Sequence, residues 1–282
     1  MRTTFIAFIT MCSTLALAAQ SKPIQVDGSE TMILFGQKCA GLYKKEAPVE
    51  VTVRGGVVAN AFKSMTNGKV DIVQSDRPVA GHNGIPIGVH SIVVYVNNVN
   101  SVSELSLAQL KGIFLGKIKN WKEVGGVDQP IALFAGESTS GILDFFQEIV
   151  LGGEEPYPFW GKSTPKELIE AVVADKSAIG YTNFTETKQV KRLKIKGANA
   201  VPVEPTLENI RSLKYPIARN VYWYVASSTA GSAQSFAQWV LGPRGQLVVE
   251  SIGYEPLNNE ERQKGMQALV KIFGGGGIRS GN

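Results

Sequence analysis

The sequence predicts an α/β protein that folds as two lobes around one cleft. Apolar runs of strand length alternate with segments of helical spacing along nearly the whole chain, a pattern typical of sheets covered by helices. Segments 97–100 and 221–225 indicate where the chain crosses to a second lobe and returns. Three turns rich in glycine or serine lead from a strand into a helix. Two lobes joined by two crossovers would bring these turns around one cleft, beyond the carboxyl ends of the strands.

The start of the chain, residues 1–19, predicts a secretory signal peptide. Arg2 precedes an apolar stretch, and Ala16-Leu17-Ala18 has the form of a cleavage site. The stretch is too short and too interrupted by polar residues to span a bilayer. Small residues are missing next to Cys12, so we expect no lipid anchor. The predicted product is a free periplasmic protein in which Cys39 is the only remaining cysteine and forms no intramolecular disulfide.

In the first lobe, strands are expected at 24–26, 49–53, 70–73 and 91–95. Helices are expected at 31–45 and 58–67, where the apolar residues follow helical spacing. The strand at 70–73 must stop in the polar loop Gln74-Ser75-Asp76-Arg77-Pro78, because proline cannot continue a central strand. The first crossover is placed after the strand at 91–95. We therefore assign residues 20–96 and 223–282 to lobe 1.

The second lobe is assigned residues 97–222. Helices are expected at 105–114 with Ser106 as a cap, at 142–151 and at 164–174, and strands at 130–134, 178–181 and 193–195. The strand at 221–225 is the predicted return crossover. Helices at 232–241 and 259–273 would then complete lobe 1. The glycines at 274–277 indicate a frayed end, not a phosphate loop.

The three turns are candidate anion sites, because unpaired amides and the positive end of the helix dipole face each turn. The most hydroxyl-rich of them is Gly136-Glu137-Ser138-Thr139-Ser140-Gly141. A simpler alternative is that Ser138 or Ser140 only caps the following helix. The other two turns contain Gly28-Ser29 and Gly55-Gly56.

Composition and motifs weigh against several other functions. The formal net charge is +5, which suits a small acidic ligand, but no dense Lys/Arg cluster with aromatic residues indicates a nucleic-acid partner. His82 and His90 have no neighbouring ligand cluster, so we expect no metal and place both on loops or the surface. Segment 161–164 resembles a P-loop ending, but Pro156 stands where the first glycine is required. Without a base paired to a nucleophile, we expect neither an enzyme nor a cofactor.

These segments in their order resemble the periplasmic phosphate-binding protein family, the receptor component of phosphate ABC importers in the type II periplasmic-binding-protein superfamily. The resemblance covers nearly the whole mature chain and is carried by short matches. They are Gly28-Ser29-Glu30-Thr31, Gly68-Lys69-Val70-Asp71-Ile72, Ser75-Asp76-Arg77-Pro78, Ile113-Phe114-Leu115-Gly116, Asn120-Trp121, Ser140-Gly141, Ala178-Ile179-Gly180-Tyr181, Gly245-Gln246 and Gly253-Tyr254.

The resemblance implies a bilobed receptor that closes over a dehydrated oxyanion. It implies that Asp76 is a carboxylate that accepts the proton of a protonated phosphate and so rejects sulfate, which has no proton to donate near neutral pH. The matched contacts of the first turn are Thr31 and Met32, with Ser29 beside them. The matched contacts of the third turn are Ser140 and Gly141.

The chain departs from the family pattern at three anion contacts. Val58 or a neighbour replaces a serine of the second turn, Gly136 replaces an arginine, and Ile142 replaces a hydroxyl residue. Each lost hydrogen bond is worth on the order of 1–3 kcal/mol. Two candidate replacements are Arg77, which could instead form a structural salt bridge, and Ser138 with Thr139. Asp76 could likewise bond only its own backbone.

Three functions are therefore open from the sequence. The first is a receptor for phosphate or a related oxyanion that serves an inner-membrane ABC permease. The second is the same fold with a roomier, more apolar pocket for another small anionic solute, such as a phosphonate or carboxylate. The third is a sensor or envelope-partner protein without a transport role. In each case we expect a monomer.

Overall fold

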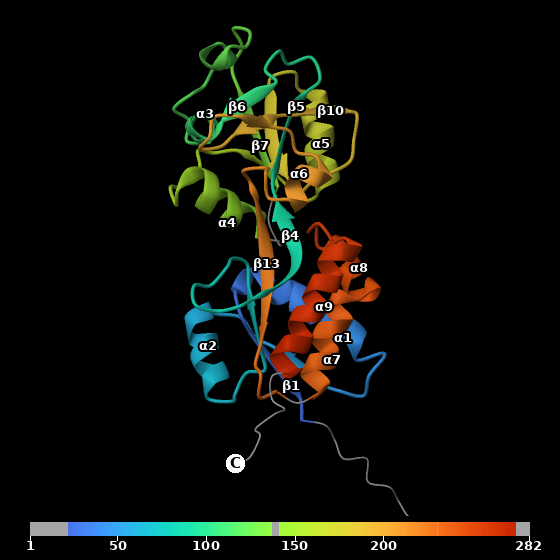
Figure 1. The fold of residues 1–282 in the computed structure, drawn as a ribbon. Coiled ribbons are helices and arrows are strands. Elements are labelled where there is room, and N and C mark those ends of the chain that lie inside the picture. Colours follow the sequence, from blue (N-terminus) through green and yellow to red (C-terminus); the bar gives the residue numbers. More distant parts are fainter. Residues whose placement is uncertain (1–21, 137–140, 230, 275–282) are drawn as a thin grey trace, which may run out of the picture.

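The computed structural model describes residues 22–136, 141–229 and 231–274. Within these ranges the chain forms two lobes, placed end to end and linked by the long strands β4 and β13 (Figure 1). Each lobe has a five-stranded sheet of its own. The arrangement confirms the predicted α/β class with two crossovers.

Lobe 1 contains a mixed sheet in the order β2-β1-β3-β13-β4. The first three of these strands pair in parallel, whereas β13 is antiparallel to both of its neighbours. The strands are β1 (Ile24–Gly28), β2 (Val51–Val53), β3 (Ile72–Ser75), β4 (Ile85–Ser91) and β13 (Ala218–Val225). The helices of this lobe are η1 (Glu30–Met32), α1 (Ile33–Tyr43), α2 (Val58–Thr66), α7 (Gly231–Leu241), α8 (Pro243–Ser251) and α9 (Asn259–Gly274).

Lobe 2 contains a second sheet in the order β10-β5-β9-β7-β8 and a small sheet in the order β12-β11-β6. The strands are β5 (Val93–Asn97), β6 (Glu104–Ser106), β7 (Ala132–Gly136), β8 (Trp160–Lys162), β9 (Ala178–Thr182), β10 (Val190–Arg192), β11 (Lys194–Lys196) and β12 (Pro202–Val203). The helices are α3 (Leu107–Phe114), η2 (Trp121–Val124), α4 (Ile142–Phe146), the π-helical turn η3 (Gln147–Leu151), α5 (Pro165–Ala174) and α6 (Leu207–Arg211).

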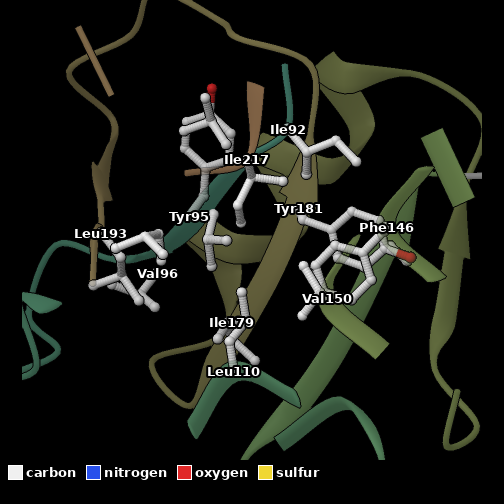
Figure 2. Close-up of a cluster of buried hydrophobic side chains, with 14 of the residues drawn as sticks. Ile92, Tyr95, Val96, Leu110, Phe146, Val150, Ile179, Tyr181, Leu193 and Ile217 are labelled. Atoms are coloured by element: carbon white, nitrogen blue, oxygen red, sulfur yellow. The ribbon is translucent and has the colours of Figure 1, made fainter. Parts of the chain in front are cut away.

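Each sheet has a hydrophobic core against its helices, because its strands carry β-branched and aromatic side chains on the covered faces. In lobe 2, Phe146 and Tyr181 stack with ring centroids 3.7 Å apart and Val150 lies beside them, while Ile179 lies next to Leu110 in the same core (Figure 2). Phe146 ends α4, just before Glu148 on the π-helical turn. This core therefore fixes the helical segment that carries Glu148.

The chain changes sheet earlier than we expected. Strand β4 is followed by β5 with only Ile92 between them, and β5 already pairs with β9 of lobe 2. The expected strand at 91–95 thus spans the crossing, and the polar segment 97–100 lies beyond it. On the return, the Ile92 amide donates to the Ile217 carbonyl at 3.0 Å, and β13 begins at Ala218. We therefore propose lobe boundaries at Ile92 and Ile217 in place of residues 96 and 222.

Candidate functional site

The predicted first and third turns meet between the lobes. Ser29 follows β1 and is buried, and its Oγ lies 2.9 Å from Thr31 Oγ1. Gly141, with φ of +72°, precedes α4; a Cβ built on it would lie 3.1 Å from Thr31 Cβ. Thr31 and Gly141 are thus brought together from opposite lobes. Ser138, Thr139 and Ser140 lie outside the described residues.

Met32, the second matched residue of the first turn, packs its side chain into the core of lobe 1. This side chain is fully buried, and the Met32 amide donates to the Ser29 carbonyl at 3.1 Å. At the second turn, Val57 is the residue that precedes α2, and its side chain makes no cap hydrogen bond. The second turn therefore lacks a capping hydroxyl at the start of α2, whereas the first turn has the hydroxyls of Ser29 and Thr31.

Asp76 follows β3 and is 3% exposed. Its Oδ2 accepts from Arg219 Nη2 at 2.7 Å, and its Oδ1 accepts from Arg77 Nε at 3.3 Å. Burial alone would raise the pKa of Asp76, but the guanidiniums of Arg219 and Arg77 outweigh burial and hold this pKa below its ordinary value. Arg77 Nη2 also donates to Oδ2, at 3.5 Å. A carboxylate has about four lone-pair sites, so these three contacts leave about one for a further proton donor.

Glu148 completes a ring of alternating charges with these three residues. Its Oε1 accepts from Arg77 Nη1 at 2.6 Å, and its Oε2 accepts from Arg219 Nη1 at 2.8 Å. Because Glu148 belongs to lobe 2 and Asp76 to lobe 1, the ring spans the gap between the lobes. We call these four residues the charge ring.

An aromatic cluster lies against the charge ring. The guanidinium of Arg219 lies 4.0 Å from the Phe145 ring centroid, and the His90 ring is 4.6 Å from both Phe145 and Tyr254. His90 is 1% exposed within β4, so its predicted place on a loop or the surface is wrong. Burial and the nearby Arg219 lower the pKa of His90 to about 3, against a smaller opposing effect of Asp76. His82, in contrast, is exposed and stacks on Phe62.

The sequence drew no attention to Arg219 or Glu148. Arg219 lies on β13, two residues before the strand at 221–225 that was predicted as the return crossover, and this position was the only signal that the residue would lie near the cleft. Glu148 lies on the predicted helix at 142–151, two turns beyond Gly141. A carboxylate on the polar side of this helix, where Asp144 also lies, gives no indication of which partners it will meet.

Two cavities lie between the lobes near the first and third turns. One has a volume of about 360 Å³ and is lined by Glu30, Thr31, Ile33, Leu34, Gln37, Gly141 and Asp144. The second, of about 340 Å³, shares Leu34 with the first and continues past Ile142. The interlobe space thus passes the first and third turns. Among the residues that the structure describes, no group of acidic, histidine and cysteine side chains could hold a metal, and no helix is long and apolar enough to cross a bilayer.

Comparison with known proteins places the chain in a family. The family model of the PBP superfamily domain matches residues 14–244, well over half of the chain. The protein belongs to the PBP superfamily. Among solved structures of this fold, a possible phosphate binding protein from Planctomyces limnophilus aligns with a TM-score of 0.80 and 26% identity, over 89% of this chain and 99% of that one.

Curated relatives align with most of the length of this PBP superfamily member. Protein SphX from Synechococcus elongatus is 28% identical over 85% of this chain and 79% of its own length. The phosphate-binding protein PstS from Bacillus subtilis is also 28% identical, over 85% of this chain and 82% of its own length. A Vibrio cholerae ABC-type phosphate transport receptor, at 22% identity and a TM-score of 0.65, shares the fold over 83% of this chain and the whole of its own.

Proposed function

We propose that this protein is a periplasmic receptor that captures phosphate or a related oxyanion between its lobes for an ABC importer. Asp76 carries the proposal. It is buried, ionised and situated where β3 ends at the interlobe gap, so it can accept a proton from a protonated oxyanion but would repel one without a proton. Membership of the PBP superfamily and relatives named phosphate-binding proteins support the same assignment.

Calorimetry of the mature protein tests the proposal. Phosphate should bind, whereas sulfate should give no heat at the same pH, because its lone pairs would face the Asp76 carboxylate. Replacing Asp76 with Asn should weaken phosphate binding by roughly 10- to 100-fold, the loss of a hydrogen bond to a charged group. The matched control is Asp128→Asn, which changes an exposed carboxylate on lobe 2. Equal phosphate affinity in Asp76→Asn and the wild type would contradict the assignment.

A second candidate is a receptor of the same fold for a larger anion, such as a phosphonate. The observation that favours it is the composition of the helix starts: Val57 offers no cap to α2, and Ile142 is the first residue of α4. The 340 Å³ cavity beside Ile142 adds space for a substituent. A phosphonate that binds more tightly than inorganic phosphate in the same calorimeter would favour this candidate.

Export and delivery are part of the proposal. We propose that residues 1–19 are removed and that the mature receptor passes its ligand to an inner-membrane permease. The relatives are named binding proteins, which favours a receptor over an enzyme. Mass spectrometry of the exported protein should give a chain that begins after Ala18 or Ala19; a mass that includes the leader would contradict its removal.

A further inference from the structure

The family resemblance implies an arginine that pairs with the anion at position 136, but this chain has glycine there. The structure brings two guanidiniums to Asp76 instead, from Arg77 and Arg219. They differ in burial: the side chain of Arg77 is 54% exposed and that of Arg219 is 13% exposed. A buried guanidinium is screened less by solvent than an exposed one, so Arg219 exerts the stronger field on Asp76.

Arg219 is held in a single orientation. Nη2 bonds Asp76, Nη1 bonds Glu148, and the guanidinium lies 4.0 Å from the centroid of the Phe145 ring. Its Nε is buried and has no hydrogen-bond partner among the described residues. A buried donor without a partner is costly, so this N–H is available to an acceptor that enters the gap.

The groups that orient Arg219 belong to different lobes. Asp76 follows β3 of lobe 1, whereas Phe145 and Glu148 lie on α4 and η3 of lobe 2. Arg219 itself is near the start of β13, close to where the chain returns from lobe 2. Its contacts to Glu148 and Phe145 therefore exist only while the lobes are together. Glu148 also accepts from Arg77, which gives a second ion pair across the same gap.

We propose that Arg219 is the arginine of the anion site and that Glu148 is its positioning residue, so that closure of the lobes sets the charge that faces the ligand. This inference rests on the proposed function in one respect, that the anion binds against Asp76. With the lobes closed, Glu148 fixes Arg219 and Arg219 keeps Asp76 ionised. A ligand that carries a proton is then accepted, and one without a proton is rejected. With the lobes open, Arg219 loses Glu148 and this discrimination weakens.

Glu148→Gln tests the positioning role, because it keeps the shape of the side chain and removes its charge. The expected result is a phosphate Kd raised roughly 10- to 100-fold, together with a smaller ratio of sulfate Kd to phosphate Kd. Glu148→Asp should recover part of both, because it restores the charge. The matched control is Glu154→Gln, a half-exposed carboxylate of lobe 2 that pairs with Lys111, and it should bind as the wild type does.

The pH dependence of phosphate binding separates positioning from simple structural damage. The phosphate affinity of the wild type and of Glu148→Gln is measured from pH 5 to 8. The titratable and charged groups around Arg219 are Asp76, Glu148, Arg77, His90 and Tyr254. The variant should lose affinity toward the acidic end at a higher pH than the wild type, because the pKa of Asp76 rises when its arginine is no longer fixed. Identical pH profiles and identical sulfate rejection would overturn the inference.

Solution scattering without ligand covers the case in which no anion binds the wild-type protein. That result would remove the proposed function, while the role of Glu148 in holding the lobes together would still be measured. Glu148→Gln should then show a larger radius of gyration than Glu154→Gln at the same salt concentration. Equal radii in the two variants would overturn the coupling of Glu148 to closure, whatever the ligand is.

Discussion

Gly28, at the end of β1, is the position where we expect the largest effect from one added methyl group. Its φ is +136°, and a Cβ there would lie 2.0 Å from the carbonyl oxygen of Gln74 on the paired strand β3. The obstructing atom is backbone, and it already accepts from the Ser29 amide at 2.9 Å. The unfavourable φ costs about 1–2 kcal/mol and the overlap about 1–3 kcal/mol. Gly28→Ala should therefore lower the free energy of unfolding by about 2–5 kcal/mol.

Urea denaturation followed by circular dichroism measures this loss, and two other glycines serve as controls. Gly68 has φ of +67° with nothing within 4 Å of an added Cβ, so Gly68→Ala should cost only about 1–2 kcal/mol from the backbone conformation. Gly41 lies in α1, also with nothing within 4 Å, so Gly41→Ala should gain about 0.5–1 kcal/mol. If Gly28→Ala loses no more than Gly68→Ala, the argument from the β1–β3 contact is refuted.

Three further changes give distinct outcomes. Gln246→Leu should cost about 3 kcal/mol or more in urea denaturation, because it leaves two buried carbonyls and one amide without their partner; a loss below about 1 kcal/mol would contradict this. His90 has a pKa of about 3 in the folded state, below its ordinary value, so stability should fall as pH drops from 6.5 toward 3, where only the unfolded chain gains the proton. The urea midpoint of His90→Leu should vary less over that range, and an equal slope would refute the assignment. Ser106→Ala removes the capping box with Gln109 and should cost about 1 kcal/mol in the same assay; an unchanged midpoint would argue against the cap.

Local pattern was enough to predict much of the fold. Strand β3 was expected at 70–73 and lies at Ile72–Ser75, so Gln74 and Ser75 are buried strand residues and not part of the expected loop. Asp76 nevertheless follows the carboxyl end of a buried strand, as expected. The Ser106 cap of α3 is confirmed as well. The helix predicted at 142–151 is present but changes from α to π geometry at Gln147. That change depends on packing in lobe 2 and leaves no mark in the apolar spacing.

The charge ring could not be predicted in the same way. Asp76 and Arg219 are 143 residues apart, and Arg219 and Glu148 are 71 apart. Which charged side chains pair depends on how the two lobes pack against each other. The hydrophobic periodicity of the sequence carries no information about that packing. The early crossing at Ile92 was missed for a related reason: β4 and β5 form one apolar stretch, and only pairing partners divide it between two sheets.

The strand order of lobe 1 constrains the sequence of events in folding. Strand β13 lies between β3 and β4, although more than a hundred residues separate it from either in the chain. The middle of this sheet therefore stays open until the chain has been made beyond residue 225. Lobe 2 is continuous from Ile92 to Ile217 and needs no later segment for its own sheet. Lobe 2 can consequently assemble first. Strand β13 then pairs with β3 on one side and β4 on the other, and so completes the sheet of lobe 1.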